Sequence, residues 1–382
     1  MAYRGVQAIL IGAALSIVSI HGDTGSPPQS LPLDVSVPFR PTLVKALGRT
    51  HLLYELRITN FRTAPVELVR IEVLAHDASI QNLQETDLDT RLSRPGVTET
   101  ASKRTLGAGL TAIVFLDVVL DENPSPILRH RLHVKVDGGA SSEMTLIAAE
   151  TAVDPVASLT VEPPLHGESW VALNGLSNES THRRTVIVVD GKATIAQRFA
   201  TDWTRLGRDG QAFHDDPSNN ANWYAYGAEV RSVSDGIVTD LQDGIPENNP
   251  TLDQKAVAID LQTAPGNYLI LQLAPNRYAL YAHLQPGSLR VRRGDHVRTG
   301  QSLALLGNSG NSDAPHLHFH ICDANSALRC EGVPYVIDRF ALLGVLPSLA
   351  VLTNGTGWKP DGQPAAERIL EIPVRNAVVR FR

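Results

Sequence analysis

The sequence is poor in charge and in basic clusters, and these shortages limit what the protein can bind. Of 382 residues only 19% are charged, the formal net charge is −6, and no long run of lysines or arginines occurs. Proteins that bind a phosphate backbone need a clustered basic face, so we expect no nucleic-acid partner. After the first 20 residues no segment is apolar enough to span a membrane, so no integral membrane segment is expected once the N-terminus is cleaved.

The N-terminus has the pattern of an export signal. Arg4 precedes an apolar stretch over residues 6–18, and polar residues follow it. This predicts a signal peptide over residues 1–22, a Ser/Pro-rich linker over 23–30, and a secreted or periplasmic protein. A retained membrane anchor is the alternative, but the stretch is shorter than the roughly 20 apolar residues that a spanning helix needs.

Cysteine is scarce as well. The only two, Cys322 and Cys330, flank a turn-rich segment that can bring them into bonding range. In an oxidising compartment this favours a local disulfide. A metal site built on two thiolates would need further ligands nearby, and none follows Cys330.

Helical periodicity is nearly absent, and short alternating runs predict a mainly β protein of two or three domains. Residues 31–155 alternate in this way and are predicted to form an immunoglobulin-like β-sandwich that serves as an accessory domain. Residues 156–178 are interpreted as a second linker. A second, antiparallel β domain is expected over 179–345, followed by a C-terminal β extension over 346–382.

One strand stands out within the second β domain. Side chains alternate between the two faces of a strand, so His316, His318 and His320 are expected to project from one face, while Leu317 and Phe319 pack on the other. Neutral imidazole is the commonest metal ligand in proteins, so three imidazoles on one face indicate a metal site.

The second β domain resembles the lysostaphin-like zinc metallopeptidases (peptidase family M23), which cut peptide cross-links in bacterial peptidoglycan. The resemblance covers roughly residues 180–325. It is carried by segments 226–238, Tyr281-Ala282-His283-Leu284, 294–301, Gly307-Asn308-Ser309-Gly310-Asn311-Ser312 and Pro315-His316-Leu317-His318-Phe319.

The resemblance implies a lysostaphin-type sheet, one zinc ion and peptidoglycan as the substrate. By position it makes Asp202 and His318 metal ligands, His283 and His316 the catalytic pair, and places His320 where the family often has Glu. Three protein ligands leave a fourth position open, at which zinc activates a water molecule.

The sequence departs from the family pattern at the first ligand. Four residues before Asp202, where the family has histidine, stands Arg198, which has no lone pair to donate to a metal. The Asp190-Gly191 turn suggests a substitute: counting outward from it, His182 lies opposite Phe199, one position from Arg198, and a bulge would turn its imidazole toward the metal. His214, in a loop, is the second candidate.

Three functions are therefore compared. The first is a zinc-dependent endopeptidase that hydrolyses peptide bonds in peptidoglycan stem peptides or cross-bridges. The second, favoured by Arg198, is a catalytically degenerate peptidoglycan-binding protein or a regulator of another hydrolase. The third is a carrier domain, since residues 291–303 look like a lipoyl hairpin, but no lysine lies between Lys255 and Lys359 to be modified.

Overall fold

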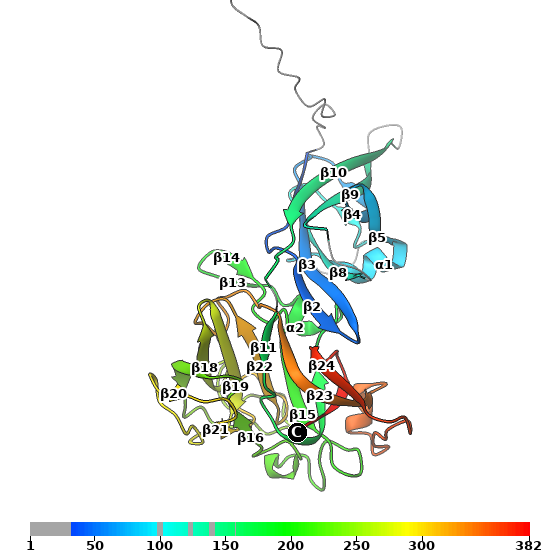
Figure 1. Cartoon of the computed structure of the whole chain (residues 1–382). Helices are drawn as coiled ribbons and strands as arrows, with labels where there is room; N and C mark the ends of the chain where they lie inside the picture. Colours follow the sequence, from blue (N-terminus) through cyan, green and yellow to red (C-terminus); the bar gives the residue numbers. More distant parts are fainter. Residues whose placement is uncertain (1–31, 98–101, 121–124, 137–141, 157) are drawn as a thin grey trace, which may run out of the picture. The chain divides into compact units, whose positions relative to one another are not determined.

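The computed structural model describes residues 32–97, 102–120, 125–136, 142–156 and 158–382. The predicted signal peptide (1–22) and first linker (23–30) lie outside these residues. Strands, almost all of them antiparallel, are the main regular structure of the described chain and helices are few and short, which confirms the prediction of a mainly β protein (Figure 1). Within this part of the chain, every helix is too short or too polar to cross a bilayer.

Two five-stranded sheets form what we call the N-terminal β region (residues 33–152). One has the order β1 (Leu33–Ser36), β3 (Arg49–Asn60), β8 (Thr111–Leu120) and β6 (Leu92–Ser93), with β2 (Thr42–Ala46) also on β3. The other has the order β10 (Ser142–Ala152), β9 (Ile127–Val136), β4 (Val66–Ala75) and β5 (Ala78–Gln84), with β7 (Thr105–Leu106) on β4, and helix α1 (Glu85–Arg91) follows β5.

The two sheets pack face to face, and strands such as β9 bury alternate side chains between them. Along β9, Leu132 and Val134 are buried while the residues between them are partly exposed. From β9, His130 reaches across to β3, where its Nε2 lies 2.8 Å from Tyr54 Oη. The immunoglobulin-like order of connections stays a prediction.

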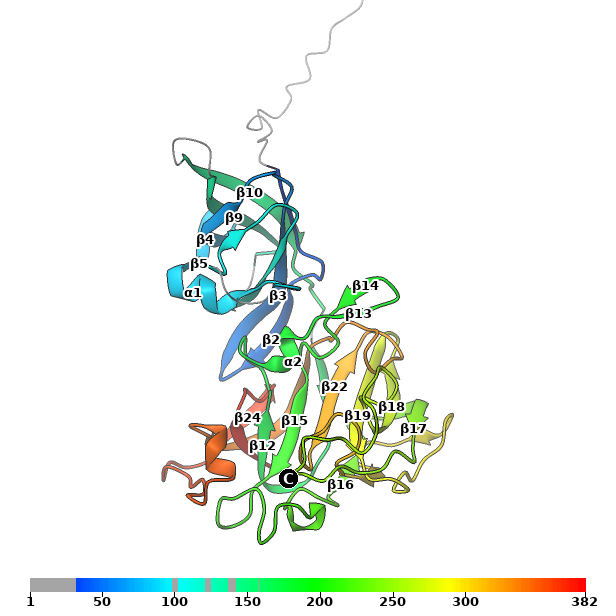
Figure 2. The same ribbon diagram turned by 180° about the vertical axis from the view of Figure 1, so that it is seen from behind.

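The rest of the chain is organised around one eleven-stranded sheet. Its order is β11 (Leu159–Val161), β23 (Tyr335–Val345), β25 (Ala377–Phe381), β12 (Gly167–Leu173), β15 (Thr201–Arg205), β22 (Leu317–Cys322), β19 (Arg277–Leu284), β18 (Asn267–Ala274), β17 (Gly236–Gln242) and β20 (His296–Val297), with β24 (Ala366–Glu371) on β23. Figure 2 shows β12, β15, β22, β19 and β18 following one another across it.

The expected linker and the expected C-terminal extension both contribute strands to this sheet. Residues 156–178 are interpreted from the sequence as a linker, but they contain β11 and β12. Trp170 of β12 is buried in the core. The C-terminal extension supplies β24 and β25, and β25 lies between β23 and β12. A strand paired on both sides is an integral part of its sheet, so both segments belong to the fold that carries the candidate site.

Smaller elements complete the structure. They are helix α2 (Thr181–Arg184), the hairpin β13 (Ile187–Val189) and β14 (Lys192–Thr194), the pair β16 (Glu229–Arg231) and β21 (Ser302–Leu305), and the 3-10 turns η1 (Asn220–Asn222) and η2 (Leu349–Leu352). Asp190 and Gly191 both have positive φ (48° and 75°), as a tight hairpin turn requires. The expected disulfide between Cys322 and Cys330 is present.

Candidate metal centre

The candidate metal ligands come together because their strands are neighbours. β22 lies between β15 and β19, and the pairing register places His318 directly opposite Asp202 on one side and Ala282 on the other. His318 Nδ1 lies 2.9 Å from Asp202 Oδ1. The predicted alternation of β22 holds, since Leu317 and Phe319 are part of the hydrophobic core.

His182 also reaches this point, but not by the predicted route. The β13–β14 hairpin ends at Ile187 and Thr194, so the extrapolated pairing of His182 with Phe199 does not form. Instead His182 lies on helix α2, with its Nε2 3.2 Å from Asp202 Oδ2 and its ring 4.8 Å from that of His318. The potential ligand atoms of His182, Asp202 and His318 all lie within 4.8 Å of one another.

This donor set fits zinc. Two imidazoles and a carboxylate are ordinary zinc ligands, and neighbouring ligand atoms of a tetrahedral site with bonds of about 2.0–2.1 Å are about 3.3–3.4 Å apart. The separations are 3.2 Å from His182 Nε2 to Asp202 Oδ2 and 2.9 Å from His318 Nδ1 to Asp202 Oδ1, so each histidine lies beside a different oxygen of the carboxylate. Burial alone would raise the pKa of Asp202, but His182 and His316 outweigh it and hold this pKa well below its ordinary value.

His320 supports His318 from behind. His318 Nε2 lies 2.8 Å from His320 Nδ1, so a His318 ring that offers Nδ1 to a metal can donate its Nε2 proton to His320. Burial first, and then the neighbouring His318 and His182, hold the pKa of His320 well below its ordinary value, which keeps it neutral and able to accept. At this position, where the resemblance leads us to expect a glutamate, a neutral histidine can accept the hydrogen bond from His318.

Asn174 is a residue that the sequence did not reveal. It follows β12 in the left-handed region (φ 50°), and its Nδ2 donates to Asp202 Oδ2 at 3.0 Å. Its Oδ1 accepts from Thr181 Oγ1 at the start of α2. Asn174 therefore ties together the elements that carry two of the candidate ligands, although it lies in the segment interpreted as a linker, where no motif marked it.

His283 lies beside the ligands in a constrained conformation. Its φ of 64° is uncommon for a residue other than glycine, and backbone hydrogen bonds with Pro265 and Gly307 hold it. His283 Nδ1 lies 2.8 Å from Ser309 O, and since a carbonyl can only accept, Nδ1 carries the proton and a neutral ring keeps a lone pair at Nε2. Burial, assisted by His316 and His318, lowers the pKa of His283 well below its ordinary value.

His316 completes the group that we call the histidine cluster (His182, Asp202, His283, His316 and His318). Its ring lies 4.7 Å from that of His283, and its Nε2 faces Asp202 Oδ1 at 3.5 Å. Its Nδ1 donates to the Ala314 carbonyl at 2.8 Å. Burial would lower the pKa of His316, but Asp202 outweighs burial and raises it.

Arg198 points away from the histidine cluster and belongs to a second buried group. Its Nε and Nη2 donate to both oxygens of Glu55, Nη2 also donates to Glu331, and Nη1 donates to the Gly332 carbonyl. Together with Arg183, which lies 3.5 Å from Glu55, these side chains form what we call the arginine cluster (Glu55, Arg183, Arg198 and Glu331). The residue in the place of the family's first ligand thus has a structural role.

His214, the other candidate for the missing ligand, lies elsewhere. Its side chain is 46% exposed, its Nδ1 pairs with Asp215 at 2.8 Å, and its ring contacts Tyr224. It is not brought to Asp202 and His318.

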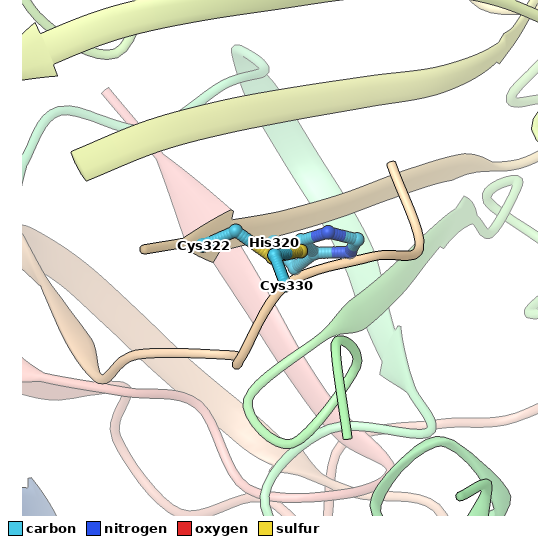
Figure 3. Close-up of side chains that lie close together, drawn as sticks. All are labelled: His320, Cys322 and Cys330. Carbon is cyan, nitrogen blue, oxygen red and sulfur yellow. A yellow bond between two sulfur atoms is a disulfide. The ribbon is translucent and has the colours of Figure 1, made fainter. Parts of the chain in front are cut away.

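A second group of potential ligands is made of His320, Cys322 and Cys330 (Figure 3). The two sulfur atoms are bonded to each other, so no thiolate is free to bind a metal. Together with the pairing of His320 to His318, this leaves the histidine cluster as the stronger candidate among the described residues.

The histidine cluster opens into a cavity of about 740 Å³. Leu261 and Leu349 line it and are exposed by 54% and 44%, so part of its wall is apolar. Leu349 belongs to η2, in the C-terminal extension. The candidate ligands therefore line a cavity, with histidine side chains facing it.

Fold and site define a β-sheet protein with a three-ligand candidate metal centre beside a cavity. Residues 223–330 match the model of peptidase family M23. The matched segment includes His283, His316 and His318, whereas His182 and Asp202 precede it.

The curated relatives share only short segments with this chain. The peptidoglycan DD-endopeptidase ShyB of Vibrio cholerae is 33% identical over 75 residues, which are 20% of this chain and 17% of ShyB. Lysostaphin of Staphylococcus simulans is 31% identical over 83 residues, 21% of this chain and 16% of lysostaphin. Among solved structures, a zinc-containing peptidase from Vibrio cholerae has 14% identity and a TM-score of 0.25, and the match covers 78% of this chain and 83% of that one.

Proposed function

We propose that this protein is a zinc-dependent endopeptidase that hydrolyses peptide bonds in bacterial peptidoglycan, in stem peptides or cross-bridges. The observation that carries the proposal is the convergence of His182, Asp202 and His318 within 4.8 Å beside the cavity. In this proposal His182 serves as the ligand that Arg198 cannot provide. The arginine at the position of the family's first ligand is the feature of the sequence that argues against catalysis.

His182, Asp202 and His318 would hold the ion. When bound, zinc would supply Lewis-acid activation of a water nucleophile and of the scissile carbonyl. Asp202 and His318 are buried, and Asn174 and His320 hold them in place, so little reorganisation of these two ligands is needed to bind the ion.

His283 and His316 would handle the protons of the reaction. Hydrolysis of an amide adds a hydroxyl group to the carbonyl carbon, breaks the C–N bond and delivers one proton to the leaving amine. His283 is oriented by Ser309 so that Nε2 of its neutral ring can accept a proton from the attacking water. His316, held by Ala314, presents its Nε2 from the adjacent position and can stabilise the developing negative charge or protonate the amine.

The choice of peptidoglycan as the substrate is supported by the family match and by the activity named for ShyB. A cell-wall substrate agrees with the export expected from the N-terminus, and places the protein in the periplasm or outside the cell. The cavity has room for several residues of an extended peptide, and its wall is partly apolar.

The proposal is tested by zinc content and wall hydrolysis measured on the same preparations. We expect about one zinc per chain by elemental analysis, lost in His318→Ala and His182→Ala, and chelator-sensitive release of peptide fragments from purified peptidoglycan. A wild-type chain that binds peptidoglycan without zinc or cleavage would instead establish the non-catalytic binding function.

A further inference from the structure

The helix that supplies His182 is too short to be stable by itself. Helix α2 has four residues, and its backbone is held by single bonds from Arg184 N to Ser180 O and from Thr185 N to His182 O. The first turn of a helix forms at an unfavourable free energy, and a helix of one turn has too few backbone hydrogen bonds to offset it. The position of His182 must therefore depend on tertiary contacts of its neighbours.

The strongest of these contacts is made by Arg183, the next residue. It is 1% exposed, and its Nη2 donates to the carbonyls of Tyr54 (3.1 Å) and Leu116 (2.7 Å), which belong to β3 and β8 of the N-terminal β region. Adjacent helical residues point about 100° apart, so His182 faces the metal centre while Arg183 is anchored in the N-terminal β region.

Glu55 on β3 balances the buried charge of this anchor. It is 1% exposed, it accepts hydrogen bonds from Arg198, and its Oε1 also lies 3.5 Å from Arg183. Nε and Nη1 of Arg183 are buried without a hydrogen-bond partner, so the polar contacts of this guanidinium are two carbonyls and the Glu55 carboxylate, beside the Phe115 ring 6.0 Å away. Removing one partner of a buried ion pair leaves the other charge uncompensated, which favours expulsion of the arginine from its site.

We propose that Glu55 is a positioning residue for the metal centre: it holds Arg183 in the N-terminal β region, and through Arg183 it fixes His182 as the third metal ligand. This inference rests on the proposed metal site. It gives the N-terminal β region a function in addition to that of a spacer, because it completes the site by contacts with the residue next to a ligand.

The test is a double-mutant cycle on zinc affinity in the full chain. The protein is stripped of metal, and zinc is titrated in competition with a chromophoric chelator for wild type, Glu55→Gln, His182→Ala and the double variant. Glu72→Gln is the matched control, because Glu72 is also a buried carboxylate of the N-terminal β region but pairs with Arg131 and His133 within that region.

We expect Glu55→Gln to weaken zinc binding by roughly 10- to 100-fold, as is typical of residues that orient a ligating histidine. Glu72→Gln should keep the wild-type affinity. In the His182→Ala background the titration is extended to the weaker zinc affinity that Asp202 and His318 retain, and there Glu55→Gln should cause no further loss, because its effect passes through the side chain already removed. A general loss of folding would not show this dependence on His182.

If Glu55→Gln does not fold, Arg183→Lys takes its place in the cycle, since lysine keeps the charge but lacks the guanidinium fork. Wild-type zinc affinity in the Glu55 variant, or an equal loss with and without His182, overturns the inference and leaves the proposed function intact. A wild-type chain that binds no zinc overturns both.

Discussion

The histidine cluster is largely buried and the arginine cluster fully so, both contain carboxylates, and both receive a side chain from α2, yet they are suited to different tasks. Arginine offers only hydrogen-bond donors, and all three nitrogens of the Arg198 guanidinium group are paired with Glu55, Glu331 or the Gly332 carbonyl. Imidazole and carboxylate groups offer lone pairs, and those of the histidine cluster converge beside a cavity.

The difference shows how to separate a structural from a functional group of buried charges. Charged groups that are already paired with each other by hydrogen bonds have no uncompensated charge with which to bind a ligand. A group of imidazoles around one carboxylate offers lone pairs and gains most when a metal cation is added. The following predictions test this contrast, beginning with the largest effect.

The replacement Asp202→Asn should abolish the metal site. Asparagine keeps the shape but removes the charge that lies between His182 and His318. We expect zinc to fall from about one per chain to near zero by elemental analysis, together with complete loss of hydrolysis. Retention of stoichiometric zinc would show that the ligands lie elsewhere.

The replacement His283→Gln should separate chemistry from metal binding within the histidine cluster. Glutamine can still donate to the Ser309 carbonyl but cannot take a proton, so kcat should fall by roughly 10²- to 10⁴-fold. Zinc content, measured on the same sample, should stay near one per chain. If kcat is unchanged, His283 is not the base.

The replacement Arg198→Met should act on stability alone. Glu55 and Glu331 would lose a buried cation, and removal of one partner of such a pair costs about 3–5 kcal/mol. Because Glu55 still faces Arg183, we expect the folded fraction to keep its zinc. Urea unfolding with a parallel zinc assay checks both points, and zinc loss without destabilisation would contradict the contrast between the clusters.

The smallest effect is expected from acidification. Burial would raise the pKa of Glu55, but Arg198 and Arg183 outweigh it and hold this pKa below its ordinary value. A carboxyl group with a depressed pKa stabilises the fold above its unfolded value of about 4.3, and this contribution is lost as the pH falls through the folded pKa. The difference in unfolding free energy between wild type and Glu55→Gln should therefore be constant above about pH 5 and shrink below it. If the difference in unfolding free energy stays constant down to the lowest pH at which the protein folds, the ionised Glu55 carboxylate does not stabilise the fold.

Local patterns carried the parts of the fold that could be predicted. Alternation along β22 gave the shared face of His318 and His320, and the Asp190-Gly191 turn gave the pairing of Val189 with Lys192. These features depend on residues near in sequence, where periodicity and turn chemistry are decisive.

The features that escaped prediction depend on distant partners. His182 takes its place because Arg183 binds carbonyls more than 60 residues away, and not because a hairpin continues. β11 has three residues and is identified as a strand only by its parallel pairing with β23. Three residues are too few for an alternating pattern to predict a strand. The distant carbonyls that Arg183 contacts leave no pattern in the sequence around it.

The place of β25 in the eleven-stranded sheet has a consequence for the order of assembly. β25 is the last described strand to be synthesised, yet β12 and β23 both pair with it. Until residues 377–381 leave the ribosome, both strands have an unpaired edge, and exposed edges recruit other chains. The sheet that aligns β15 with β22 therefore gains its last described strand only after residues 377–381 have been made, so the candidate metal centre forms in a sheet whose two parts are joined late.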